Sequence, residues 1–257
     1  MKLSFRRDRE APSRSVPTHA DFPTVSGADI AGMVHGQRMG GDFYHFLRAN
    51  PNRVVFGLLD IAGSHEENQP IVSAAQQTFQ KLGSQRFADG DINEADTMME
   101  FCLELNLSIR RAAAGVRSCS AFLGCYNEEL GTICYANAGH TPGLLRDPSG
   151  ITELPATGLP LGLFSASTYE APTAALQPGA SLLLVSRGVV EAAYKKEEFG
   201  LERVKQQFER SSDENAKGMA AAILDGVQQF MRAAPAQNDF TALALVRAAK
   251  GQVAIGA

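Results

Sequence analysis

Two long amphipathic stretches in the middle of the chain limit the folds that it can adopt. Residues 69–88 and 93–114 carry apolar side chains at intervals of three and four residues, the spacing of one helix face. The apolar positions are Ile71, Val72, Ala75, Phe79 and Leu82, followed by Met98, Phe101, Cys102, Leu105 and Ile109. Since residues 83–91 can connect the two stretches, we expect an antiparallel helix pair that covers one face of a sheet.

Strand patterns precede this helix pair. Residues 28–39 and 53–60 are predicted as strands, joined by a loop at residues 48–52 that contains asparagine and proline. A hairpin at this loop would bring Asp42 and Asp60 to the same end of the sheet.

Strand and turn patterns also follow the helix pair. Short apolar runs lie at residues 120–126, 132–136, 143–146 and 181–186, separated by turn sequences. Helical spacing returns at residues 200–210 and 213–233, and a last strand is predicted at residues 240–246. Strands enclosed by two helix pairs predict an α+β fold, a four-layer α/β/β/α sandwich of two antiparallel sheets flanked by helix pairs.

Composition sets the outer limits. We expect one domain at residues 26–248, a flexible N-terminal tail at residues 1–25 and a C-terminal tail at residues 249–257. The net charge of −4 over 257 residues argues against a nucleic-acid-binding protein. No apolar run approaches the roughly 20 residues of a membrane-spanning helix, so we expect no membrane contact and a cytoplasmic protein. The four cysteines form no CxxC pair, which favours reduced thiols in or near the core.

Carboxylates at two predicted strand ends suggest a site. Asp42 lies in the segment Gly40-Gly41-Asp42-Phe43-Tyr44, and Asp60 ends the apolar run of residues 54–59. Each residue alone is compatible with a turn or a cap, whereas the pair favours a ligand role for hard cations, which prefer oxygen ligands.

Six motifs together resemble one family. Their sequences are Gly40-Gly41-Asp42-Phe43-Tyr44, Asp60-Ile61-Ala62-Gly63, Tyr135-Ala136-Asn137-Ala138-Gly139-His140, Gly158-Leu159-Pro160-Leu161-Gly162, the run 183–192 that contains Ser186-Arg187-Gly188, and Asn238-Asp239-Phe240-Thr241. Their order is similar to that in the SpoIIE/RsbU-like branch of the PPM-type metal-dependent serine/threonine phosphatases. The resemblance covers residues 28–247.

The resemblance implies a two-metal site with Mn²⁺ or Mg²⁺, in which the ions activate a water that attacks the phosphorus of a phosphoserine or phosphothreonine. Asp42 and Asp60 match metal-ligand acids with catalytic roles, and the main-chain carbonyl of Ile61 matches a further ligand. These three positions keep the chemistry of the first metal site.

The second metal site departs from the family pattern. Arg187 replaces one ligand acid and Asn238 replaces another, so we expect at most one tightly bound ion. Asp239 is expected to point away from the site, because neighbouring strand residues face opposite sides of a sheet. His65 lies near the position of a family histidine and is expected to be exposed, and His140 is interpreted as a structural turn residue.

Two functions therefore remain open. One is a weak, Mn²⁺- or Mg²⁺-dependent phosphatase in bacterial partner-switching regulation. The alternative is an inactive pseudophosphatase that binds a phosphoprotein or a regulator, in which Arg187 contacts phosphate as an arginine fork can. Arg187 turned to solvent is the competing interpretation. The resemblance implies a phosphorylated regulatory protein as partner, with anti-sigma-factor antagonists as the usual class. Related domains can dimerise through their helices, so a homodimer is also compatible.

Overall fold

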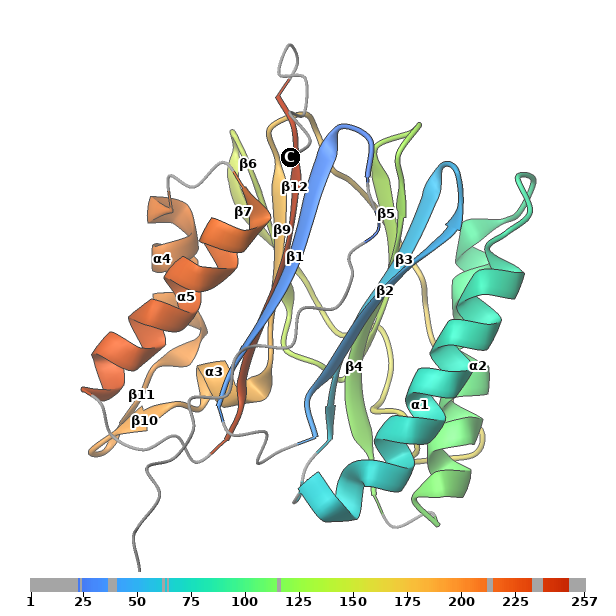
Figure 1. Cartoon of the computed structure of the whole chain (residues 1–257), viewed down its shortest axis with the longest axis horizontal. Coiled ribbons are helices and arrows are strands. Elements are labelled where there is room, and N and C mark those ends of the chain that lie inside the picture. The colour runs from blue at the N-terminus through green and yellow to red at the C-terminus, as the bar shows by residue number, and fades with distance from the viewer. Residues whose placement is uncertain are drawn as a thin grey trace, which may run out of the picture.

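The computed structural model describes residues 23, 25–36, 41–61, 63, 65–114, 117–211, 215–232 and 238–249. Two antiparallel sheets pack face to face, and a pair of helices covers the outer side of each sheet (Figure 1). The predicted four-layer α/β/β/α sandwich is confirmed. The predicted tails, residues 1–25 and 249–257, fall largely outside the described residues.

Each sheet contains five strands. In the first, the spatial order is β1 (Ala28–His35), β12 (Phe240–Arg247), β9 (Ser181–Val185), β6 (Gly143–Asp147) and β7 (Gly150–Leu154). In the second, it is β2 (Phe43–Asn50), β3 (Arg53–Ile61), β4 (Cys119–Asn127), β5 (Thr132–Ala138) and β8 (Thr173–Ala175).

The helices divide between the two outer faces. α1 (His65–Arg86) and α2 (Glu94–Ala112) cover the second sheet, whereas α4 (Gly200–Arg210) and α5 (Ala216–Met231) cover the first (Figure 1). The short α3 (Arg187–Val190) follows β9 directly and leads to the small hairpin of β10 (Ala193–Tyr194) and β11 (Glu197–Glu198). Both long helix pairs were predicted from their apolar spacing.

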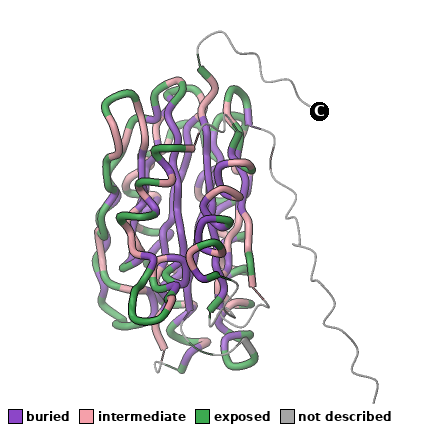
Figure 2. Tube along the Cα trace, turned by 90° about the vertical axis from the view of Figure 1, so that its left-hand side faces the viewer, coloured by how far each residue is buried: buried purple, intermediate pink, exposed green. Residues whose placement is uncertain are grey.

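Three layers of apolar side chains hold the sandwich together. One layer lies between the second sheet and α1 with α2, another between the first sheet and α4 with α5, and the third between the two sheets. The buried segments form continuous inner layers in Figure 2, with exposed residues on the helices and loops around them. All four cysteines are free and buried, as expected from the sequence.

Asparagine side chains mark the starts of two of the helices. Oδ1 of Asn93 accepts from the main-chain nitrogens of Ala95 and Asp96 at the start of α2, and Oδ1 of Asn215 accepts from Gly218 at the start of α5. These bonds satisfy amide groups that have no partner inside a helix.

The hairpin before the helix pair differs from the sequence prediction. Its strands are β2 and β3, while the strand at residues 28–35 pairs with β12 in the other sheet. Phe43 lies opposite Leu59, so Asp42 and Asp60 do reach the same end of the sheet. This is the end at which α3 lies, at the bottom of Figure 1.

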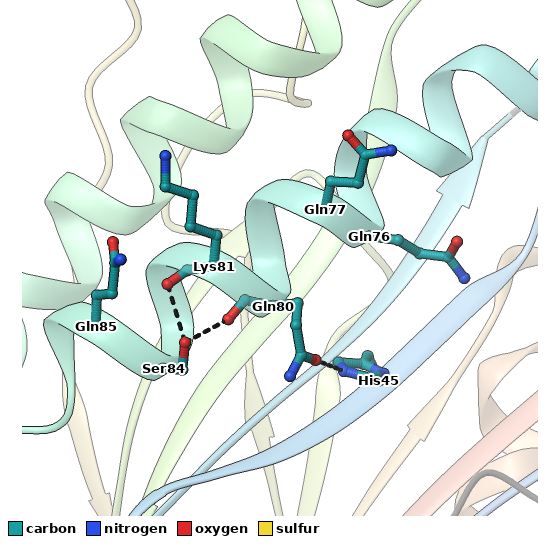
Figure 3. Close-up of a pocket in the computed structure, with 7 residues that line it drawn as sticks. All are labelled: His45, Gln76, Gln77, Gln80, Lys81, Ser84 and Gln85. Atoms are coloured by element: carbon teal, nitrogen blue, oxygen red, sulfur yellow. Dashed lines mark hydrogen bonds between the residues drawn. The ribbon is translucent and has the colours of Figure 1, made fainter.

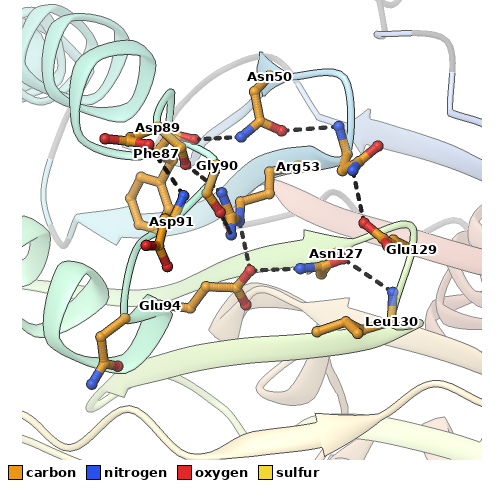
Figure 4. A network of polar contacts seen from close by, with 12 residues as sticks. Asn50, Arg53, Phe87, Asp89, Gly90, Asp91, Glu94, Asn127, Glu129 and Leu130 are labelled. Carbon is orange, nitrogen blue, oxygen red and sulfur yellow. Dashed lines mark hydrogen bonds and ion pairs between the residues drawn. The ribbon is translucent and has the colours of Figure 1, made fainter.

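A polar network closes the opposite end of the second sheet (Figure 4). Arg53 Nε binds Oε1 of Glu94 at 2.6 Å, and Asn127 Nδ2 donates to the same oxygen at 2.7 Å. Arg53 also donates to the carbonyls of Asp89 and Gly90 in the connection between α1 and α2. This network fixes the connection to the sheet at the end remote from Asp60. None of the described helices is long and apolar enough to cross a membrane.

Candidate active site at the end of the sandwich

Asp42 and Asp60 lie at one end of the layer between the two sheets. Leu58 packs in this layer, so Asp60, two residues further along β3, faces the same side. Asp42 immediately precedes β2, two residues before Tyr44, which also packs against this layer. Asp60 is 7% exposed. The sequence correctly predicted that both carboxylates would come together.

The two carboxylates act on each other electrostatically. The pKa of Asp42 is raised from 3.8 to about 7, first by burial and then by the charge of Asp60. Hydrogen bonds from Thr241 and Ser186 lower this pKa, while the charge of Asp239 raises it further. Thr241 Oγ1 donates to Oδ2 of Asp42 at 2.6 Å. A cation beside Asp42 and Asp60 would reduce their mutual repulsion.

Arg187 contacts Asp60 through both its main chain and its side chain. The main-chain N–H of Arg187 donates to Oδ2 of Asp60 at 3.0 Å. The guanidinium Nη2 lies 3.7 Å from Oδ1 of Asp60, and Nε lies 3.7 Å from Oε1 of Glu191. Because the Arg187 side chain is 48% exposed, these two longer contacts are screened by solvent.

The carbonyl of Ile61 accepts a hydrogen bond within the protein. Nδ2 of Asn68, a buried residue of α1, donates to it at 3.0 Å. Arg117 Nη1 donates to Oδ1 of Asn68 at 3.1 Å, and Arg117 Nη2 pairs with Glu67 at 3.0 Å. A carbonyl oxygen has two lone pairs, so this bond leaves one for a further partner. Sequence reasoning missed Asn68 and Arg117, because nothing in the local pattern links them to Ile61.

The two late motifs meet next to these residues. Ser186 Oγ accepts from the main-chain nitrogen of Thr241 at 3.1 Å, and the nitrogen of Ser186 donates to the carbonyl of Thr241 at 2.9 Å. A Cβ added to Gly188 would lie 2.2 Å from the carbonyl oxygen of Asp239. The glycine therefore permits a backbone approach that no larger residue allows.

The structure places Asn238 and Asp239 differently from our expectation. Asn238 is exposed, whereas Asp239 is 5% exposed and its charge acts on Asp42. Asn238 and Asp239 differ in exposure, as expected for adjacent residues, but the buried one is Asp239 and not Asn238. Leu243 packs between the two sheets, and every second residue of a strand faces the same side. Asp239 lies four residues before Leu243, so this alternation would have assigned it to the inner side.

His140 lies in a turn, as interpreted from the sequence, and this turn is close to the site. Its main-chain nitrogen donates to Oδ1 of Asn137 at 2.8 Å, which gives the predicted turn. Burial lowers the pKa of its imidazole, and the charges of Asp60 and Arg187 also act on it. The side chain of His65 lies outside the described residues.

The donor chemistry of these residues is compatible with a hard divalent cation. Asp42, Asp60 and the carbonyl of Ile61 offer oxygen atoms, the ligand type that Mg²⁺ and Mn²⁺ prefer. Within the described residues, no group of three or more His, Cys, Asp or Glu side chains is placed to hold a metal ion. Waters would therefore complete most of the coordination shell.

A groove along α1, next to His45 of β2, contains none of these residues (Figure 3). Its volume is about 510 Å³, and polar side chains line it. They are His45, Gln76, Gln77, Gln80, Lys81, Ser84 and Gln85. Neither Asp42 nor Asp60 reaches this groove, so its position gives no support to a catalytic role.

Comparisons with known proteins agree with the geometry. The chain is 25% identical over 233 residues to the phosphoserine phosphatase RsbU of Bacillus subtilis, covering 88% of this chain and 65% of RsbU. Among solved structures, the RsbU and RsbW domains of a Mycobacterium tuberculosis protein match with a TM-score of 0.71 and 22% identity, over 90% of this chain and 64% of that one. RsbX in complex with magnesium matches with a TM-score of 0.61 and 13% identity, over 90% of this chain and 98% of that one.

The PP2C phosphatase domain of SpoIIE from Bacillus subtilis also matches, with a TM-score of 0.66, and these structural matches show a shared PP2C-type fold. Residues 50–248 match the family described as Stage II sporulation protein E (SpoIIE). This match covers well over half of the chain and includes Asp60, Ile61 and Arg187, whereas Asp42 precedes the matched residues. The chain therefore belongs to the SpoIIE family, in the SpoIIE/RsbU branch of the PPM-type phosphatases.

Proposed function

We propose that the chain is a phosphoserine/phosphothreonine phosphatase domain that keeps one metal position and has lost much of the second. The observation that carries this proposal is the pair of the half-buried Asp42 and the buried Asp60, in which desolvation and the charge of Asp60 raise the pKa of Asp42 to about 7. Two carboxylates that repel each other in this way favour a bound divalent cation.

Asp42, Asp60 and the carbonyl of Ile61 would hold the ion. A bound Mn²⁺ or Mg²⁺ supplies a Lewis acid for the phosphoryl oxygens and a water of lowered pKa. Thr241 and Ser186 keep the carboxylate of Asp42 in place and favour its ionised form. Asp60 is oriented by the main-chain nitrogen of Arg187.

The second metal position lacks its acids. Arg187 places a cation beside Asp60, and Asn238 is neutral and exposed. We expect this position to take a second ion only weakly, because a guanidinium repels it. Asp239 adds a buried carboxylate near Asp42, and its negative charge partly compensates for the two replaced acids.

The contact between Arg187 and Asp60 supports a second candidate function. An arginine beside an acidic pair can bind a phosphate through two hydrogen bonds, but it does not activate a water as a metal ion does. In this alternative the domain is a pseudophosphatase that holds a phosphorylated regulator without hydrolysing it. The family's partner-switching circuits make an anti-sigma-factor antagonist the partner to test first in either case.

Calorimetric titration with Mn²⁺ and Mg²⁺, beside hydrolysis of an aryl phosphate and a phosphoserine peptide, separates the two functions. A weak phosphatase is expected to bind one Mn²⁺ tightly and to hydrolyse both substrates slowly. A pseudophosphatase is expected to bind the phosphopeptide without turnover at any metal concentration. Tight binding of two equivalents of Mn²⁺ would contradict the proposal that the second metal position has lost much of its affinity.

A further inference from the structure

His140 presents a buried nitrogen atom that no described residue satisfies. The residue is 5% exposed and follows the end of β5. Nε2 of its imidazole has no hydrogen-bond partner among the residues that the structure describes. A buried polar atom without a partner is uncommon in folded proteins and indicates an unseen water, ion or ligand.

The other ring nitrogen fixes the tautomer. Nδ1 of His140 lies 3.1 Å from the carbonyl oxygen of Thr141 and 3.0 Å from its Oγ1. The hydroxyl of Thr141 already donates to the carbonyl of Val185, so its oxygen accepts from the ring. Both neighbours of Nδ1 are therefore acceptors, and Nδ1 carries the hydrogen.

A neutral imidazole with hydrogen on Nδ1 has its lone pair on Nε2. Burial lowers the pKa of His140, which keeps the ring neutral. Histidines that bind metals have this arrangement, in which one ring N–H donates to a main-chain carbonyl and the other nitrogen is the ligand. The bond to Thr141 thus holds Nε2 ready to act as a ligand or an acceptor.

The same contacts place the ring beside the acidic pair. Thr141 is bonded to Val185, the last residue of β9, and Arg187 is bonded through its main-chain nitrogen to Asp60. The ring is close enough for the charges of Asp60 and Arg187 to act on it. Gly139, the neighbour of His140, is bridged to Ala121 of β4, and the adjacent Ser120 pairs with Asp60, so the strand pairing also places His140 close to Asp60.

We infer that Nε2 of His140 is a nitrogen ligand which, with Asp60, holds the weakly bound second ion. This inference rests on the proposed phosphatase function and defines the metal that the site selects. Imidazole suits Fe²⁺ and Zn²⁺, and the transition metal ion Mn²⁺ accepts a nitrogen ligand beside its oxygen ligands, whereas Mg²⁺ keeps oxygen ligands and waters. The second position then favours a transition metal ion over Mg²⁺.

The side chain of Arg187 is compatible with such an ion. Its guanidinium is half exposed and lies 3.7 Å from both Asp60 and Glu191, distances longer than a tight ion pair. The guanidinium can turn to solvent while the main-chain bond to Oδ2 of Asp60 stays in place. An entering ion would compete with the side chain of Arg187 for Oδ1 of Asp60.

The test is pulsed electron paramagnetic resonance of Mn²⁺ bound to the whole chain. Nitrogen coordination gives a ¹⁴N coupling, and labelling the histidines with ¹⁵N replaces it by a ¹⁵N coupling without any substitution. Wild type should show the coupling, and H140Q should lose it. H45A and H65A should retain it; His45 is bonded to Gln80 in the groove on α1, and His65 follows the Asp60 motif in sequence.

Calorimetry adds a second readout. H140Q should lower the Mn²⁺ affinity of the weaker position by about tenfold or more and leave Mg²⁺ affinity unchanged. Bound Mn²⁺ without histidine coupling in wild type would overturn this inference and leave the proposed phosphatase function standing. Coupling retained in H140Q, or an equal loss of Mg²⁺ affinity, would also overturn it. A wild type that binds no Mn²⁺ would overturn both proposals.

Discussion

Thr241 Oγ1 donates to Oδ2 of Asp42 at 2.6 Å, and this bond connects the two sheets at the end of the sandwich. Thr241 belongs to β12 of the first sheet, while Asp42 immediately precedes β2 of the second. The carboxylate is thus held by the opposite sheet, and its protonation depends on how the two sheets meet.

The first prediction concerns this bond. The hydrogen bond from Thr241 lowers the pKa of Asp42, so T241V should raise that pKa and leave more of the carboxyl protonated at pH 7. We expect Mn²⁺ affinity at pH 7 to fall by roughly tenfold to a hundredfold, as for the loss of one hydrogen bond to a charged group. Calorimetry measures the change, and T152V on the exposed side of β7 is the matched control. Equal affinities for T241V and wild type would contradict Asp42 as a ligand.

The second prediction concerns pH. Without metal, the folded pKa of Asp42 is about 7 and lies above its ordinary value of 3.8. The group therefore stabilises the fold below about pH 4, and this contribution is lost as the pH rises through 7. D42N should remove this part of the pH dependence and become more stable than wild type at pH 8. Urea unfolding in the presence of a chelator, between pH 4 and 8, measures it.

Metal binding should show the opposite pH dependence. The proton on Asp42 must leave before the carboxylate binds an ion, so Mn²⁺ affinity should increase with pH through 7. A Mn²⁺ affinity that is flat between pH 6 and 8 would remove Asp42 from the ligand set.

The third prediction tests Asp60. D60N keeps an oxygen that accepts from the main-chain nitrogen of Arg187, so the fold should remain intact. The lost charge should lower Mn²⁺ affinity on the order of 100-fold or more. D147N is a control at an exposed turn. Unchanged Mn²⁺ binding in D60N would refute its assignment as a ligand.

The layers of the fold were predictable from sequence because helix spacing and short apolar runs are local signals. The partner of the first strand was not predictable in this way. β1 pairs with β12, more than two hundred residues away, and nothing in the local pattern of residues 28–39 distinguishes this partner from β3. Five strands were also missed, namely β2, β7, β8, β10 and β11. The last four are only two to five residues long, and such short runs resemble loops.

The candidate site was only partly predictable. Asp42 and Asp60 were predicted as site residues from their positions at strand ends, and the pairing of β2 with β3 brings them together. Asp239 was not predicted as a site residue, because Asn238 was assumed to face the site and its neighbour to face away. The buried residues that follow Asp239 give the correct side of the sheet. Asn68 reaches Ile61 from a helix, and a hydrogen bond between a helix and a strand end has no sequence signature.

The last prediction is that R187D/N238D gains Mn²⁺-dependent phosphatase activity. Asp42, Asp60 and Arg187 together carry one net negative charge, whereas the double variant would place four carboxylates at the corresponding positions. Two divalent ions carry four positive charges, which four carboxylates can neutralise. The attraction between an ion and a carboxylate a few ångströms apart amounts to several kcal/mol at an effective dielectric of about 20.

The single variants separate the contributions to that gain. R187D should recover part of the affinity, because it removes a repelling cation from Asp60 and adds a ligand. N238D should do little while Arg187 remains, and the exposure of Asn238 beside the buried Asp239 strengthens this expectation. A wild type that hydrolyses phosphoserine peptide as fast as the double variant would exclude the pseudophosphatase. A double variant that gains neither metal nor activity would mean that residues 187 and 238 do not occupy the lost ligand positions, and Asp239 would then be the acid to test.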